Sequence, residues 1–287
     1  MIDLHVHSTM SDGTFTPREI AFYAKAKGLS AIALTDHDTT SGVVECQQNG
    51  DLVGLTVIPG IEISSDYHGT EVHILGYFID INNQMFQNKL LELKNRRNNR
   101  NSIMLERLQA QGCNITMDDI AEFITKDKTV ITRPHFARAL IKKGYVKTVD
   151  EAFDKYIGRG CPAYVSREFI DYRECIDLIH TAGGIASIAH STLYPFDEQQ
   201  FTKFLDDLLL AGIDCIESIY PEYSYAQTKF FLDFCKQHNL LITGGSDFHG
   251  DNKPSLDIGS GFGATYVADS VLVNMKQKIK EIRNDIK

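Results

Sequence analysis

Short apolar runs alternate with helical patterns over most of the chain, and this alternation limits the folds that the sequence can adopt. Strands that alternate with helices are typical of an α/β protein with a largely parallel sheet or barrel. The expected strands are Ile2–Val6, Ala31–Thr35, Leu55–Ile58, Val72–Phe78, Ile185–Ala189, Cys215–Tyr220, Leu240–Thr243 and, as a last candidate, Ala264–Val267.

Helix signals separate these runs. Thr16-Pro17-Arg18-Glu19 combines an N-cap, a proline in the first turn and a capping-box glutamate, and Gly28 supplies a left-handed stop. Further helices are expected at about Tyr172–Ala182, Glu198–Ala211, Tyr225–His238 and Ser270–Ile286.

The alternation fails between about Gln84 and Cys161, where the pattern predicts helices only. Thr116 can cap one of them, Pro134 can start another, and a capping box begins at Thr148. We therefore expect a barrel formed by residues 1–83 and 162–287, and a helical insertion, residues 84–161, that forms part of the substrate cleft.

Composition excludes several classes of protein. With 29 basic and 38 acidic residues the formal charge is −9, so a surface for duplex DNA is not expected, although carboxylates that hold metal ions would also look unpaired in this count. No apolar run approaches the roughly 20 residues that span a bilayer, and the N-terminus lacks signal-peptide blocks, so a cytoplasmic protein without a membrane segment is expected. The six cysteines form no CxxC pair, which favours reduced thiols.

Most of the apolar runs contain, or lead directly into, histidines and carboxylates. These are His5, His7, Asp12, His37, Glu62, His73, His190, Asp247 and His249. In a parallel barrel the carboxyl ends of the strands open on one face, so these residues are expected to converge.

Imidazole and carboxylate groups together favour a metal site for zinc, manganese or iron. The spacing of two in His5-Val6-His7 points both rings to the same side of a strand. Six histidines and three carboxylates are too many for one tetrahedral ion and suit two or three ions that share a bridging group.

Several motifs resemble the PHP (polymerase and histidinol phosphatase) superfamily. They are DLHVHSTMSDGT, ALTDHDT, PGIEIS, VHILGY, AHS and GGSDFHG, and RPHFARAL with the insertion is similar to the branch of 3′,5′-nucleoside bisphosphate phosphatases and 5′–3′ exoribonucleases. The resemblance implies a distorted, TIM-like (β/α)7 barrel, the PHP fold, with a trinuclear centre of manganese, iron or zinc.

The resemblance also implies roles for the nine residues. His5, His7, Glu62 and Asp247 would hold one ion, Glu62 would bridge to a second ion bound by His73 and His190, and Asp12, His37 and His249 would hold the third. The sequence departs from the familiar family pattern at Ser191, which follows His190, and near Ser166. Neither departure removes a ligand, but both put the substrate preference in doubt.

The implied reaction is hydrolysis of a phosphomonoester by a metal-activated hydroxide, with Asp247 orienting or deprotonating the water. Arg133 and His135 are the candidates for binding the phosphate, with Arg167 as a weaker one. The alternative for Arg133 and His135 is a helix start in which the arginine forms a surface ion pair and the histidine packs locally.

The expected substrates are 3′,5′-bisphosphonucleotides or the 5′ ends of short single-stranded RNA, and no obligatory protein partner is evident. The alternatives are a phosphatase for another small metabolite, such as histidinol phosphate, and a non-catalytic module that binds metal. A metal-dependent amide hydrolase is disfavoured, since no lysine lies at the end of a strand.

Overall fold

The computed structural model describes residues 1–123, 131–166 and 168–285. The chain divides into two compact units, which are described separately. The first contains Met1–Lys89 and Phe169–Lys287, and the second contains Leu90–Glu168.

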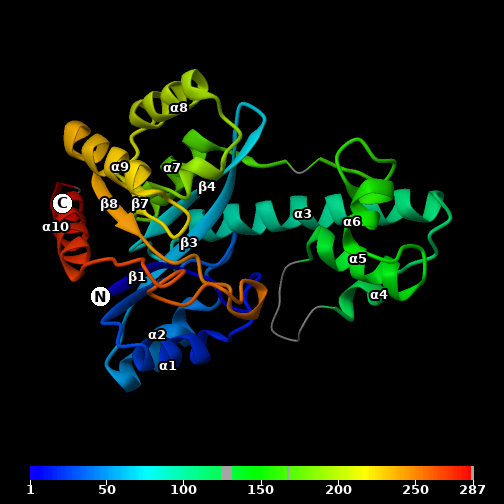
Figure 1. Cartoon of the computed structure of the whole chain (residues 1–287), viewed down its shortest axis with the longest axis horizontal. Coiled ribbons are helices and arrows are strands. Elements are labelled where there is room, and N and C mark those ends of the chain that lie inside the picture. Colours follow the sequence, from blue (N-terminus) through cyan, green and yellow to red (C-terminus); the bar gives the residue numbers. More distant parts are fainter. Residues whose placement is uncertain (124–130, 167, 286–287) are drawn as a thin grey trace. The chain divides into compact units, whose positions relative to one another are not determined.

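Seven strands of the first unit form a nearly closed barrel (Figure 1) in the order β1-β2-β3-β4-β6-β7-β8, and β5 pairs with β3. The strands are β1 Ile2–Val6, β2 Ala31–Leu34, β3 Thr56–Tyr67, β4 Thr70–Tyr77, β5 Ile170–Asp171, β6 Ile185–Ile188, β7 Cys215–Ile219 and β8 Leu241–Gly244. The two ends of the order meet just beyond β1 and β8, where the backbone N–H of His7 donates to the carbonyl of Phe248 at 2.9 Å. The predicted distorted barrel is confirmed.

One strand departs from the expected parallel arrangement. β4 runs antiparallel to both β3 and β6. It follows β3 through the two residues His68 and Gly69, whose φ angles of 49° and 89° are both left-handed, as in a type I′ hairpin turn. The expectation of a strand at Ala264–Val267 is wrong, because only Val267 pairs there, in an isolated bridge to Ile2.

Helices surround the barrel strands in the first unit (Figure 1). They are α1 Pro17–Ala26, α2 Val43–Val53, α7 Tyr172–Thr181, α8 Glu198–Leu210, α9 Tyr225–His238 and α10 Asp269–Asp285, with 3₁₀ turns η2 Ser191–Leu193 and η3 Gly250–Asn252. The predicted capping box of α1 is present, with Thr16 and Glu19 bonded reciprocally. Apolar side chains of the strands, such as Leu4 and Ala33, are fully buried in one core cluster, and Leu34 packs with Ile20 of α1 in another.

The second unit is helical, and it contains the long helix α3 from Leu90 onward, while the first residues of α3 belong to the first unit. The helices are α3 Gln84–Ala110, α4 Met117–Ala121, α5 Arg133–Lys142, α6 Val149–Ala152 and the π-helical turn η1 Phe153–Ile157. Thr116 caps α4 with a capping box, as its sequence predicts. Buried side chains such as Met104, Phe136 and Leu140 give this unit a core of its own.

The six cysteines are all free, and Cys161 is the one that is not buried. Within residues 1–123, 131–166 and 168–285, no helix combines the length and apolar character needed to cross a membrane.

Candidate metal centre

The nine predicted ligands lie together in the first unit. Their ligand atoms form four groups, in each of which the atoms lie within 4.8 Å of one another. The groups are His7, Asp12, His37 and His249; His5, His7 and Asp247; His5, Glu62 and His190; and His37, Glu62 and His73.

Strand geometry brings several of these side chains to one face. His5 and His7 are two residues apart at the end of β1, and their ring centroids are 5.1 Å apart. His73 of β4 pairs with Ser64 of β3, and Glu62 lies on the same face of β3 as Ser64. The antiparallel hairpin therefore places His73 diagonally opposite Glu62, even though β4 runs against its neighbours.

Two ligands occupy strained backbone positions directly after their strands. His190 has a φ of 27° and Asp247 a φ of 56°, both in the left-handed region that costs a non-glycine residue roughly 1–3 kcal/mol. The chain reaches Asp247 through Gly245, where a Cβ atom would lie 2.4 Å from the backbone nitrogen of His5. Glycine at this position lets the end of β8 approach β1 closely enough to bring Asp247 beside the β1 histidines.

Glu62 lies at the centre of the cluster. Its Oε1 is 3.0 Å from Nδ1 of His73 and 3.1 Å from Nε2 of His190. Its Oε2 faces a second set of rings, at 3.1 Å from Nδ1 of His37, 3.2 Å from Nε2 of His7 and 3.4 Å from Nε2 of His5. The two oxygens thus face different imidazoles, as expected of a carboxylate that bridges two cations.

Asp12, His249 and Asp247 complete the other side of the cluster. Nε2 of His249 lies 3.2 Å from Oδ1 of Asp12, and its Nδ1 lies 3.3 Å from Oδ1 of Asp247. The side chain of Asp12 is 44% exposed, whereas that of Glu62 is 1% exposed. The cluster is therefore open to solvent on the Asp12 side and closed around Glu62.

The charges of the cluster are strongly coupled. Burial lowers the pKa values of His7 and His73, but neighbouring carboxylates outweigh it and raise them to about 9 and about 10. At His37 burial prevails over Glu62 and Asp12, and the pKa falls to about 4. Burial would raise the pKa of Glu62, but the imidazoles, His37 first, hold it well below its usual range. The imidazoles therefore favour the ionised form of the Glu62 carboxylate.

The donor set fits divalent metal ions. Four imidazole nitrogens at the centre of the cluster are buried and face carboxylate oxygens, but form no well-aligned hydrogen bond with any residue that the structure describes: Nε2 of His5, both ring nitrogens of His7, and Nδ1 of His37. Buried polar atoms without a partner are costly, and a cation bound between these nitrogens and the adjacent carboxylates would satisfy them.

Glu217 of β7 is a functional residue that the sequence interpretation missed. Its carboxylate is fully buried, its Oε1 lies 2.9 Å from Nδ1 of His5, and its Oε2 accepts the backbone N–H of His190 at 2.7 Å. It therefore orients one candidate ligand through the ring and another through the backbone. The available signal was a carboxylate within the predicted strand Cys215–Tyr220.

Two buried aspartates fix the backbone around the β1 histidines. Asp36 accepts hydrogen bonds from the backbone N–H and hydroxyl of Ser8 and from the hydroxyl of Ser11, so it shapes the loop between His7 and Asp12. Asp3 accepts from the backbone N–H groups of His5 at 3.2 Å and Ser246 at 2.9 Å, and it thereby ties β1 to the segment after β8. Burial raises the pKa of both aspartates despite these hydrogen bonds.

Two tyrosines line the cluster. The Tyr194 hydroxyl accepts the backbone N–H of His73 and donates to the carbonyl of Ala189, both at 2.9 Å, which assigns it a structural role. The Tyr220 hydroxyl donates to Oδ2 of Asp247 at 3.0 Å. Oδ1 of Asp247 then faces the imidazoles, so the two oxygens of this carboxylate have different surroundings.

The predicted substrate residues lie elsewhere in the chain. Arg133 and His135 begin α5 in the second unit, and Arg167 lies outside the described residues. The Arg133 guanidinium lies over the rings of Phe153 and Tyr164, at 5.8 and 5.7 Å from their centroids. Nδ1 of His135 accepts the backbone N–H of Thr132 at 3.0 Å, so in the neutral ring the proton is on Nε2.

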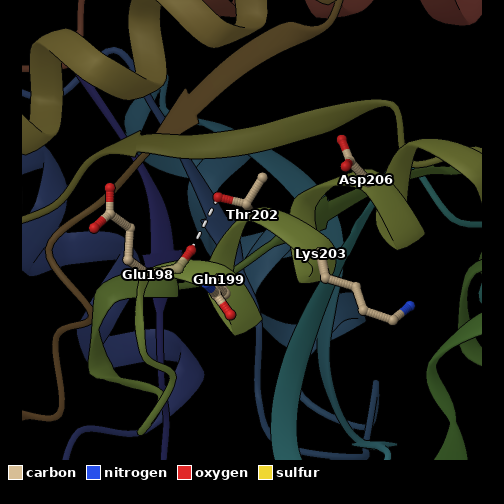
Figure 2. A pocket seen from close by; sticks show the side chains of 5 residues that line it. All are labelled: Glu198, Gln199, Thr202, Lys203 and Asp206. Atoms are coloured by element: carbon tan, nitrogen blue, oxygen red, sulfur yellow. Dashed lines mark hydrogen bonds between the residues drawn. The ribbon is translucent and has the colours of Figure 1, made fainter.

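A pocket on α8 is separate from the nine candidate metal ligands. Figure 2 shows that Glu198, Gln199, Thr202, Lys203 and Asp206 line it, and that the Thr202 hydroxyl donates to the Glu198 carbonyl at 2.9 Å. Its lining comes from one helix face and includes none of the nine candidate ligands.

Known proteins resemble this chain over most of its length. The PHP domain family matches residues 3–209. A 5′-3′ exoribonuclease from Haemophilus influenzae is 34% identical over 86% of this chain and 89% of its own length. A 3′,5′-nucleoside bisphosphate phosphatase from Chromobacterium violaceum is 33% identical over 90% of each chain.

A solved structure supports the fold and the class of reaction. The crystal structure of a protein described as a metal-dependent phosphoesterase, from Bifidobacterium adolescentis, superposes with a TM-score of 0.79 at 30% identity and covers 96% of this chain and 94% of that one. The match of the family over most of the chain, together with these relatives, identifies the protein as a member of the PHP domain family and as a metal-dependent phosphoesterase.

Proposed function

We propose that the enzyme hydrolyses phosphomonoesters of nucleotides, either 3′,5′-bisphosphonucleotides or the 5′ ends of short single-stranded RNA. The observation that carries this proposal is the cluster of nine imidazoles and carboxylates around Glu62. The relatives narrow the substrate, because one is named a nucleoside bisphosphate phosphatase and another a 5′-3′ exoribonuclease.

The cluster would hold two or three ions of manganese, iron or zinc. His5, His7 and Asp247 would bind one ion, and Glu62 would share it with a second ion held by His73 and His190. Asp12, His37 and His249 would bind the third. The separate surroundings of the two Glu62 oxygens support a bridging role.

Divalent ions in such a cluster would supply a nucleophile from water at neutral pH and neutralise charge on the phosphate oxygens. Asp247 would accept the proton of the attacking water. Its Oδ1 faces the imidazoles, while the Tyr220 hydroxyl on Oδ2 keeps the carboxylate in one orientation. A carboxylate held in this way needs no reorganisation when the proton moves.

Arg133 and His135 would bind the substrate phosphate from the insertion, residues 84–161, with Arg167 as a further candidate. The Arg133 side chain is stacked on two aromatic rings and has no ion pair among the described residues, so its planar N–H groups remain suited to a phosphate. We expect Arg133→Ala to raise KM by about tenfold, the effect of losing one charge-assisted contact. Arg138→Ala, an exposed arginine of the same helix, is the matched control. If KM and kcat both stay unchanged in Arg133→Ala, Arg133 is a structural residue.

Phosphate release from adenosine 3′,5′-bisphosphate and from a short 5′-phosphorylated RNA, both with added Mn²⁺, tests the function. Release from the bisphosphate supports the nucleotide phosphatase, and stepwise shortening of the RNA supports the exonuclease. If neither substrate reacts while p-nitrophenyl phosphate does, the nucleotide assignment is wrong. A small metabolite such as histidinol phosphate then becomes the substrate to test.

A further inference from the structure

Lys253 brings a cation to the candidate metal centre. It follows the 3₁₀ turn η3, and its Nζ lies 2.5 Å from Oδ2 of Asp247. The lysine side chain is 39% exposed, whereas that of Asp247 is 6% exposed. The ammonium group thus contacts a buried candidate ligand and is also accessible to solvent.

The loop that carries Lys253 is fixed to the exposed side of the cluster. The backbone N–H of Asp251 donates to the hydroxyl of Thr14 at 2.9 Å, and the Asn252 amide donates to the carbonyl of Asp12 at 2.5 Å. Gly250 allows this contact, because a Cβ atom there would lie 2.2 Å from the Thr14 hydroxyl oxygen. The solvent-exposed ligand Asp12 and the exposed lysine are therefore held by neighbouring loops.

Asp247 does not depend on Lys253 for its orientation. The buried hydroxyl of Tyr220 already donates to Oδ2, and Oδ1 faces His5, His7 and His249. An ammonium group has three N–H donors and no acceptor. Lys253 can therefore keep one hydrogen bond to Asp247 and direct the remaining donors towards a ligand that enters from solvent.

We infer that Lys253 is a substrate-binding residue that donates to an oxygen of the phosphate group undergoing hydrolysis. This inference rests on the proposed role of the cluster as the phosphate-binding metal centre. A phosphate monoester is a dianion near neutral pH. The other described side chains in contact with Asp247 are the neutral Tyr220 hydroxyl and the imidazoles of His5, His7 and His249, which the proposed ions would occupy. Lys253 supplies a positive charge that is not a metal ligand, and it points the phosphate towards the carboxylate that receives the proton.

Replacing Lys253 by Met tests this role, because Met keeps an unbranched apolar side chain and removes the charge. The matched control is Lys27→Met. Lys27 has nearly the same exposure, 40%, and pairs with Asp257 at 2.6 Å through a contact that includes none of the nine ligands. Inorganic phosphate binding to the Mn²⁺-loaded proteins would be measured by calorimetry, manganese per chain by elemental analysis, and KM and kcat with p-nitrophenyl phosphate.

We expect Lys253→Met to bind phosphate with an affinity about 10-fold lower than that of the wild type. KM should rise by a similar factor, and the manganese content should stay unchanged. Lys253→Arg should recover part of the affinity, and Lys27→Met should match the wild type. Unchanged phosphate affinity in Lys253→Met would overturn the inference. Loss of manganese would also overturn it, because Lys253 would then act only on the metal ligand. Phosphate binding is measured without a nucleotide substrate. A failure of the nucleotide assignment would therefore appear in the assays with the bisphosphate and the RNA, and not in this one.

Discussion

Glu217 allows a sharp test of how the metal ligands are held. Its two oxygens receive separate donors, His5 Nδ1 at 2.9 Å and the His190 backbone N–H at 2.7 Å, and all three groups are buried. In Glu217→Gln the amide oxygen can accept a hydrogen bond from one of these two donors, but the amide NH2 group must then face the other donor. A buried donor without a partner costs about 1–3 kcal/mol. Loss of a carboxylate that orients a metal-bound histidine typically costs 10–100-fold in affinity, or about 1.4–2.8 kcal/mol.

We therefore expect Glu217→Gln to bind metal about 10–100-fold more weakly than the wild type. The assay is competition for Mn²⁺ or Zn²⁺ between the metal-free protein and a fluorescent chelator, with circular dichroism to show that the variant is folded. Glu222→Gln is the control, since Glu222 is an exposed glutamate five residues further along the chain. A folded Glu217→Gln protein with wild-type metal affinity would refute the reasoning.

Three further outcomes are expected. Asp247→Ala should lower kcat for phosphate release by roughly 10²-fold or more, since it removes the proposed proton acceptor, and a folded variant with wild-type turnover would remove it from the mechanism. Gly245→Ala should lower the free energy of unfolding by about 1–3 kcal/mol, because the added Cβ would overlap the backbone of His5, and an unchanged Tm would contradict this close approach. The hydrogen bond from His180 to Asp214 raises the pKa of His180, so its contribution to stability is complete below about pH 6.5 and is lost as the pH rises through the raised value. The Tm difference between the wild type and His180→Asn should accordingly be larger at pH 6 than at pH 9, and a difference that does not change with pH would contradict it.

The clustering of the nine candidate ligands could be predicted because most of them lie in apolar strands or follow them closely. Strand ends are visible in a sequence, and a barrel brings them together whatever their separation along the chain. The hairpin between β3 and β4 did not follow from the predicted strands. The expected strands Leu55–Ile58 and Val72–Phe78 leave residues 59–71 between them, which is long enough for a crossover between parallel strands. In the structure β3 extends to Tyr67, and the connection is only His68 and Gly69.

Other parts of the site left no periodic signal. Glu217 lies inside β7, where Ile216-Glu217-Ser218-Ile219 does not alternate between apolar and polar residues, so the sequence does not tell whether the glutamate meets solvent or the interior of a barrel. Lys253 follows a short turn, and its contact with Asp247 depends on hydrogen bonds to a loop more than 230 residues earlier in the chain. The run Ala264–Val267 has strand composition, but the barrel already closes between β1 and β8 and leaves it only a bridge.

The closure of the barrel between β1 and the segment after β8 has a consequence for the order of events during synthesis on the ribosome. His5 and His7 are made first, but the backbone of each is hydrogen-bonded to Phe248. Asp3, which accepts the His5 backbone N–H, also accepts the backbone N–H of Ser246, 243 residues later in the chain. Contacts this distant along a chain form late, after the entropy of closing the intervening loop has been overcome. A nascent chain that ends before β8 therefore exposes two histidines beside acidic groups without the geometry that selects an ion. The complete set of proposed ligands is therefore available only after the segment that follows β8 has been made, since that segment carries Asp247 and His249.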